Sequence, residues 1–108
     1  MKLDIIQLEF IDLTLRQMCV WLEEQTGFEF TDTSLYRIGD PGVHGQLPLR
    51  GIDIRMRNKA VGEAIEKLIN DNWSYDPRRW KLRCAILHGE GSNLHLHLQS
   101  HKNTILIQ

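Results

Sequence analysis

The chain has 108 residues, of which 42% are hydrophobic and 25% are charged, and its formal net charge at pH 7 is -1. A chain of this length is expected to form one domain, residues 1–108, and can bury roughly two thirds of the surface that it exposes when unfolded. The balanced charge argues against a nucleic-acid partner, and the apolar runs are too short to span a bilayer. The first residues lack the apolar stretch of a signal peptide, so we expect synthesis in a cytoplasm.

A helix is predicted near the N-terminus. Residues 5–11 are rich in β-forming side chains and are expected to be extended in part. Asp12 is a typical N-cap, and Gly27 can end a helix in the left-handed conformation. Residues 13–26 carry apolar side chains at helical spacing, which predicts an amphipathic helix. Its expected buried face consists of Leu15, Met18, Cys19 and Leu22.

The middle of the chain predicts two strands separated by a long loop. Residues 28–36 alternate loosely between apolar and polar side chains, and residues 50–55 form a second short run of this kind. Residues 38–49 are rich in glycine and proline, which predicts a loop that contains His44. Loops of this length in compact domains are usually functional or disordered.

A second helix is predicted after this loop. Asn58 is a typical N-cap, and the apolar spacing that follows predicts a helix over residues 59–71. Its expected buried face consists of Val61, Ala64, Ile65, Leu68 and Ile69. Residues 72–79 are then predicted to form a turn.

The C-terminal third predicts a hairpin. Residues 80–87 and 93–101 are both expected to be strands, joined by a tight turn at residues 89–92, and residues 104–107 are expected to add a last strand. Packing in or near the core is expected for Trp21, Trp73 and Trp80, and Cys19 and Cys84 are expected to be free buried thiols. The order of the elements predicts an α+β fold, a mainly antiparallel sheet with helices packed on one face.

The strand at residues 93–101 separates leucines from histidines. Side chains two residues apart share a face of a strand, so Leu94, Leu96 and Leu98 are expected to point into the core. The opposite face consists of Asn93, His95, His97, Gln99 and His101. A row of imidazoles on one sheet face is either a solvated surface or a metal site. His101 lies near the strand end and is expected to be a surface histidine.

Asp53 is the most unusual residue of the second strand, because it stands between Ile52 and Ile54. A carboxylate in this position either faces water or has a partner. The alternation alone favours a position that faces solvent. A catalytic zinc site offers the other interpretation, since it needs three protein ligands and one open position. His44, Asp53 and one of the C-terminal histidines could supply such a set.

The order of these residues resembles that in the zinc-dependent D-Ala-D-Ala carboxypeptidases and L-alanyl-D-glutamate endopeptidases. The matching segments are Thr33-Ser34-Leu35-Tyr36-Arg37, Val43-His44, Arg50-Gly51-Ile52-Asp53-Ile54 and His95-Leu96-His97. The resemblance covers roughly residues 30–101 and is closest to small phage-encoded members of the group. It implies the hedgehog/DD-peptidase fold. The chain departs from the family pattern in a longer spacing between His44 and Asp53.

The resemblance also implies roles for individual residues. His44, Asp53 and His97 would bind Zn²⁺, and His95 would lie beside the bound water and stabilise the developing oxyanion. Arg37 would hold a carboxylate of the substrate, which suits its planar guanidinium.

Two residues compete for the role of general base. Glu90 is comparable with the acidic residue that precedes the last ligand in the family, and His88, at the end of the preceding strand, is the alternative. Both remain open from the sequence.

The resemblance implies a zinc metallopeptidase that hydrolyses amide bonds in peptidoglycan stem peptides or cross-links. As a phage-encoded, endolysin-like monomer without a signal peptide, it would act at the cell wall after release from the host cytoplasm or from the virion. An alternative is a catalytically inactive zinc-containing structural or binding module of a phage particle with the same fold. A third is a zinc-free interaction domain with a solvated histidine face.

Overall fold

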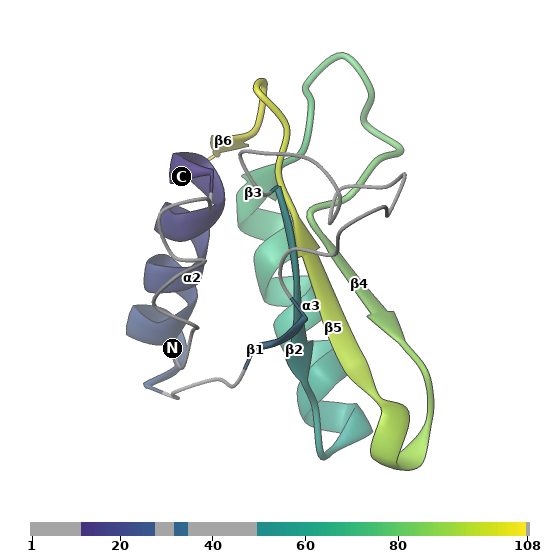
Figure 1. Cartoon of the computed structure of the whole chain (residues 1–108). Coiled ribbons are helices and arrows are strands. Elements are labelled where there is room, and N and C mark those ends of the chain that lie inside the picture. The colour runs from purple at the N-terminus through teal and green to yellow at the C-terminus, as the bar shows by residue number, and fades with distance from the viewer. Residues whose placement is uncertain (1–11, 28–31, 35–49, 108) are drawn as a thin grey trace.

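The computed structural model describes residues 12–27, 32–34 and 50–107. The elements are α2 (Leu13–Thr26), β1 (Asp32–Ser34), β2 (Gly51–Arg55), α3 (Lys59–Asn72), β3 (Trp73–Ser74), β4 (Ala85–His88), the 3-10 turn η2 (Gly91–Asn93), β5 (His95–Gln99) and β6 (Ile105–Leu106). This mixture of helices and antiparallel strands confirms the α+β class (Figure 1). No helix among the described residues is long and apolar enough to cross a membrane.

The main sheet has the strand order β1-β2-β5-β4, and each neighbouring pair is antiparallel. β4 and β5 form the predicted hairpin. Their pairing begins at Ala85, which lies opposite Leu98. β2 lies on the other side of β5, so segments far apart in the sequence are neighbours at the centre of the sheet (Figure 1). A smaller sheet pairs β3 with β6.

One face of the main sheet is apolar and covered by helices, as expected. Leu96 and Leu98 of β5 have no exposed surface and share a cluster with Ile52 and Ile54 of β2. α3 lies behind the sheet, and α2 lies to one side of it (Figure 1). The buried residues of both helices belong to the same hydrophobic cluster. Since every second side chain of β5 is buried here, the polar side chains between them must lie on the opposite face.

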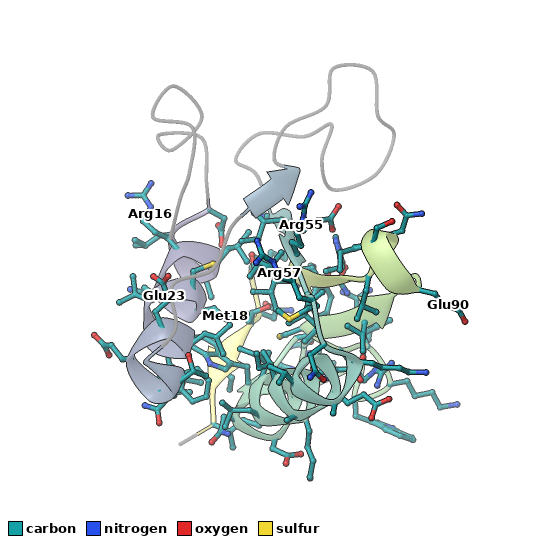
Figure 2. The ribbon with its side chains drawn as sticks, turned by 90° about the horizontal axis from the view of Figure 1, so that it is seen from below. Arg16, Met18, Glu23, Arg55, Arg57 and Glu90 are labelled. Carbon is teal, nitrogen blue, oxygen red and sulfur yellow. The ribbon has the colours of Figure 1, made fainter. Side chains whose placement is uncertain are left out.

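The first helix was predicted with the correct bounds. The side chain of Asp12 accepts a hydrogen bond from the backbone N–H of Leu15, and Gly27 ends the helix with a φ of 72°. Leu15, Met18, Cys19 and Leu22 are the buried residues of α2. Figure 2 shows the side chain of Met18 directed inward from α2. Cys19 and Cys84 are free and buried, as expected.

The second helix was predicted almost to its last residue, but part of its buried face was wrong. Val61 is 40% exposed and Ala64 is exposed, whereas Gly62 is buried. A Cβ atom on Gly62 would lie 2.9 Å from the side chain of Leu87 of β4, so α3 lies close to the sheet at this glycine. The buried stripe therefore runs through Gly62, Ile65 and Ile69 rather than through Val61.

The segment between α3 and β4 differs from its prediction in two places. Residues 72–79 contain the short strand β3, in which Trp73 is buried and pairs with Leu106. The predicted strand over residues 80–87 begins only at Ala85, because the preceding residues turn, with the N–H of Leu82 donating to the carbonyl of Arg79. The packing role expected for Trp80 is wrong, since 79% of its surface is exposed.

Three predictions concern residues that lie outside the described part of the chain. These are the extended segment at residues 5–11, the loop at residues 38–49, and most of the strand at residues 28–36, of which only β1 is described.

Candidate metal centre

The face of the main sheet opposite the helices carries several polar residues that the sequence singled out. In the register of β2 and β5, Asp53 lies directly opposite His97. His95 lies opposite Arg55 on one side and His88 of β4 on the other. The prediction that His95, His97 and Gln99 share one face is therefore confirmed by the pairing, since all three alternate with buried leucines.

Asp53 and His97 are in direct contact. Oδ1 of Asp53 lies 2.8 Å from Nδ1 of His97, and the two side chains are only 11% and 15% exposed. The interpretation of Asp53 as a solvent-facing residue is thus wrong, and the alternative, a carboxylate with a partner, is correct. Pairing with a histidine lowers the free-energy cost of removing the carboxylate from water. The partner lies on another strand, so the alternation along β2 alone could not reveal it.

The second ring nitrogen of His97 is also engaged. Nε2 of His97 lies 3.2 Å from Oε1 of Gln99, the next residue on the same face. The amide nitrogen of Gln99 donates to the backbone carbonyl of Arg83 at 2.8 Å. Both nitrogens of the ring are therefore directed by neighbouring groups, which fixes the orientation of the imidazole.

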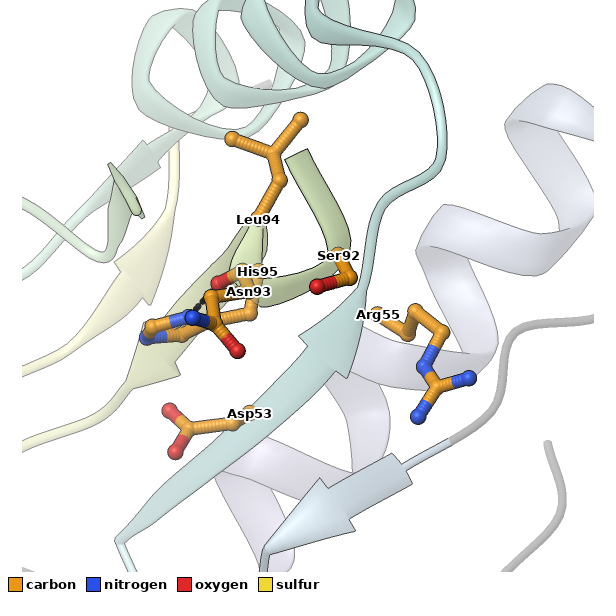
Figure 3. Close-up of a pocket in the computed structure, with 6 residues that line it drawn as sticks. All are labelled: Asp53, Arg55, Ser92, Asn93, Leu94 and His95. Carbon is orange, nitrogen blue, oxygen red and sulfur yellow. Dashed lines mark hydrogen bonds between the residues drawn. The ribbon is translucent and has the colours of Figure 1, made fainter. Parts of the chain in front are cut away.

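His95 has a different set of contacts. Its Nδ1 lies 2.9 Å from the carbonyl oxygen of Asn93, the bond drawn in Figure 3. The ring of His88 stacks on that of His95, with centroids 5.4 Å apart, and meets the ring of His97 at 6.5 Å. The three imidazoles thus form one contiguous group on strands β4 and β5.

A pocket of about 220 Å³ opens beside this group. It is lined by Asp53, Arg55, Ser92, Asn93, Leu94 and His95 (Figure 3). Arg55 extends away from Asp53 in this view, and its guanidinium forms no hydrogen bond or ion pair with another described residue. Arg55 stands two residues after Asp53 and therefore on the same face of β2, a spacing that could have identified it from the sequence.

Glu90 and His88 occupy very different positions. Glu90 is exposed in the turn between β4 and β5, and Figure 2 shows its side chain directed away from the body of the protein. His88 contacts both His95 and His97. Of the two candidates for the general base, His88 is the one that the described structure brings next to the pair.

His101 lies apart from the group. It follows the end of β5, its ring packs against Tyr75 with centroids 5.6 Å apart, and its Nδ1 lies 3.9 Å from a carboxylate oxygen of Asp76. The same nitrogen accepts a hydrogen bond from the N–H of Asn103. His101 therefore belongs to the loop around Asp76 and not to the histidine face.

The Asp53–His97 pair fits a divalent metal in donor type and spacing. Two ligand atoms of a tetrahedral zinc site lie about 3.3 Å apart, so the observed 2.8 Å requires only a small separation of the two side chains. Within residues 12–27, 32–34 and 50–107, no group of three such side chains is placed to hold a metal ion. The predicted third ligand, His44, and the predicted substrate-binding Arg37 lie outside the described residues.

Comparison of the chain with protein-family models, with curated proteins and with solved structures found no match.

Proposed function

We propose that the protein is a zinc-dependent peptidase of the hedgehog/DD-peptidase type that hydrolyses amide bonds in peptidoglycan stem peptides or cross-links. The observation that carries this proposal is the contact between Asp53 and His97, two of the three proposed ligands, on the polar face of the main sheet. The chain brings them together from positions 44 residues apart. An aspartate and a histidine that converge in this way would supply two of the three protein ligands of a catalytic zinc site.

The ligand set would be Oδ1 of Asp53, Nδ1 of His97 and the imidazole of His44. Zinc held by such a set would supply a bound water of lowered pKa and a Lewis acid for the scissile carbonyl. Asp53 contributes one negative charge to the set, and Gln99 holds the ring of His97 in place.

His95 and His88 would handle protons and developing charge beside the metal. His95 lines the pocket, and its Nδ1 is occupied by the carbonyl of Asn93, so Nε2 is the ring nitrogen that would act. Once His95 has accepted a proton at Nε2, it could stabilise the oxyanion of the tetrahedral intermediate. His88, stacked on it at the exposed end of β4, could accept or deliver that proton. We retain Glu90 as the alternative base, which would have to swing in from the turn.

Stem peptides of peptidoglycan carry free carboxylates, which agrees with the proposed role of Arg37. Arg55 adds a cationic side chain to the pocket wall. The enzyme would be made in a host cytoplasm, work as a monomer and reach the wall after release, as phage-encoded cell-wall hydrolases do.

The test combines metal content with activity. Protein purified without a histidine tag is expected to bind about one equivalent of zinc and to release new amino groups from purified peptidoglycan. His97→Ala and Asp53→Ala should lose both properties. His101→Ala is the matched control and should keep both, because His101 lies in a separate loop.

The outcomes separate the alternatives. Zinc binding without hydrolysis would support the inactive phage-particle module and overturn the enzyme. Less than about half an equivalent of zinc, unchanged by His97→Ala, would overturn the metal site and favour the zinc-free interaction domain. Comparing His88→Ala with Glu90→Ala identifies the base, since only the variant that lacks the base should lose turnover while retaining zinc.

A further inference from the structure

We propose that Gln99 is a positioning residue that fixes His97 in the tautomer whose Nδ1 binds the metal, while the carbonyl of Asn93 fixes neighbouring His95 in the opposite tautomer. This inference rests on the proposed zinc site and goes beyond it, because it assigns each ring nitrogen of the two histidines. The residues of the His95-Leu96-His97 motif would then differ in function because they differ in hydrogen bonding.

The first step concerns the orientation of the Gln99 amide. Its nitrogen lies 2.8 Å from the backbone carbonyl of Arg83, which can only accept a hydrogen bond. The amide therefore donates to that carbonyl, and its oxygen must be the atom that faces His97. The N–H of Gln99 also donates, at 2.8 Å, to the carbonyl of Cys84, so the backbone of this residue is held by the adjacent strand as well.

The second step concerns His97. The oxygen of the Gln99 amide only accepts, so Nε2 of His97, 3.2 Å away, must carry a proton. Nδ1 lies 2.8 Å from the carboxylate of Asp53, which also only accepts, so without a metal Nδ1 donates to Asp53. A metal bound at Nδ1 would replace that proton, whereas Nε2 would keep its own proton for Gln99. A hydrogen bond from the non-ligating nitrogen of a histidine to a fixed acceptor is the usual way in which proteins orient metal-binding imidazoles.

The third step concerns His95, which has the reverse arrangement. Its Nδ1 lies 2.9 Å from the carbonyl oxygen of Asn93, so Nδ1 carries the proton and Nε2 keeps the lone pair of the neutral ring. None of the described residues forms a hydrogen bond with Nε2 of His95, so this nitrogen is available to a reacting group. His95 therefore suits proton transfer at Nε2, and His97 suits metal binding at Nδ1.

Two substitutions of Gln99 separate a positioning role from a structural one. Gln99→Leu removes both the acceptor for His97 and the donor to Arg83. Gln99→Glu also removes that donor but keeps an acceptor oxygen for Nε2 of His97. A merely structural role predicts similar damage from both substitutions. A positioning role predicts that glutamate preserves zinc binding, since a carboxylate is an even stronger acceptor for the ring N–H.

The measurement is the zinc dissociation constant, determined by competition with a chromophoric chelator, on variants whose fold is checked by circular dichroism. We expect Gln99→Leu to weaken zinc binding by about 10- to 100-fold, the usual effect of losing such a partner. Gln99→Glu should bind zinc within about threefold of the unsubstituted protein or more tightly. Gln25→Leu, at an exposed position of α2, is the control and should change nothing.

The tautomers are read directly from the unsubstituted protein. In the zinc-loaded form with ¹⁵N-labelled histidine, long-range ¹H–¹⁵N correlation spectra should show a protonated Nε2 for His97 and a protonated Nδ1 for His95. Ligation of zinc through Nε2 of His97, or an unchanged dissociation constant in Gln99→Leu, overturns the inference. Zinc bound through Nδ1 without any peptidase activity overturns only the proposed function. Failure of the unsubstituted protein to bind zinc overturns both.

Discussion

Asp53 and His97 form the central polar contact of the sheet, with Oδ1 and Nδ1 2.8 Å apart and both side chains nearly enclosed. This contact predicts strong coupling between the two residues in metal-free protein. Asp53→Val or His97→Val alone removes this hydrogen bond from a buried polar side chain, which should cost about 1–3 kcal/mol of the free energy of unfolding. The double variant should cost less than the sum by about 1–2 kcal/mol. Urea unfolding with a chelator present measures all three variants, and additive costs would contradict the coupling.

Gly89 supports the hairpin that carries His95. Its φ is 82°, and a Cβ atom there would lie 2.3 Å from the carbonyl oxygen of Asn93, the group that holds the His95 ring. We expect Gly89→Ala to cost at least about 2 kcal/mol, because it combines an unfavourable backbone conformation with a backbone clash. Gly91→Ala is the matched control. Its φ of 56° is also positive, but nothing lies within 4 Å of the added atom, so it should cost only about 1 kcal/mol.

Thermal unfolding distinguishes these two glycine variants, and equal losses would show that the contact with Asn93 has no effect. A shift of the His95 ring resonances in Gly89→Ala, but not in Gly91→Ala, would link the turn to the histidine face.

The sequence predicted elements whose determinants are local. The N-cap at Asp12 and the left-handed Gly27 define α2, and the alternation of leucines defines the buried face of β5. These features depend on residues only a few positions apart, so a single sequence contains the information. The same reasoning placed Asn58 at the start of α3.

The features that the sequence did not reveal depend on contacts between distant elements. The buried stripe of α3 is set by the close approach of Gly62 to Leu87, which shifts Val61 toward solvent. Asp53 faces His97 because β2 pairs with β5 in one particular register. Alternation shows that Asp53 lies on a face, but it cannot show what lies across that face. The face that carries the histidines could thus be predicted from the sequence, but the contact of His97 with Asp53 could not.

Asp12 connects the start of α2 to the end of β5. One carboxylate oxygen accepts hydrogen bonds from the N–H of Leu15 at 3.2 Å and from the hydroxyl of Ser100 at 3.0 Å. Ser100 has no exposed surface, so Asp12→Ala should leave its hydroxyl unpaired as well as uncapping the helix. We expect a loss of about 2–3 kcal/mol. Asn58→Ala removes only the cap of α3, whose bonds are exposed, and should cost about 1 kcal/mol.

Chemical denaturation compares the two cap variants. Adding Ser100→Ala to Asp12→Ala should restore part of the loss, because the unpaired hydroxyl is then absent. Equal costs for Asp12→Ala and Asn58→Ala would show that the bond to Ser100 contributes nothing.

Cys84 should make the protein sensitive to alkaline pH. Burial raises the pKa of its thiol from 9.0 to about 12, because the fully enclosed sulfur cannot be solvated as a thiolate. The unfolded chain therefore loses this proton at a lower pH than the folded chain. The contribution of this thiol to the free energy of unfolding is fully present below about pH 9. It falls as the pH rises toward 12, by up to about 1.4 kcal/mol per pH unit. Urea unfolding between pH 8 and 10.5 should show a shallower decline for Cys84→Ala than for the unsubstituted protein. Parallel declines would mean that Cys84 ionises equally in both states.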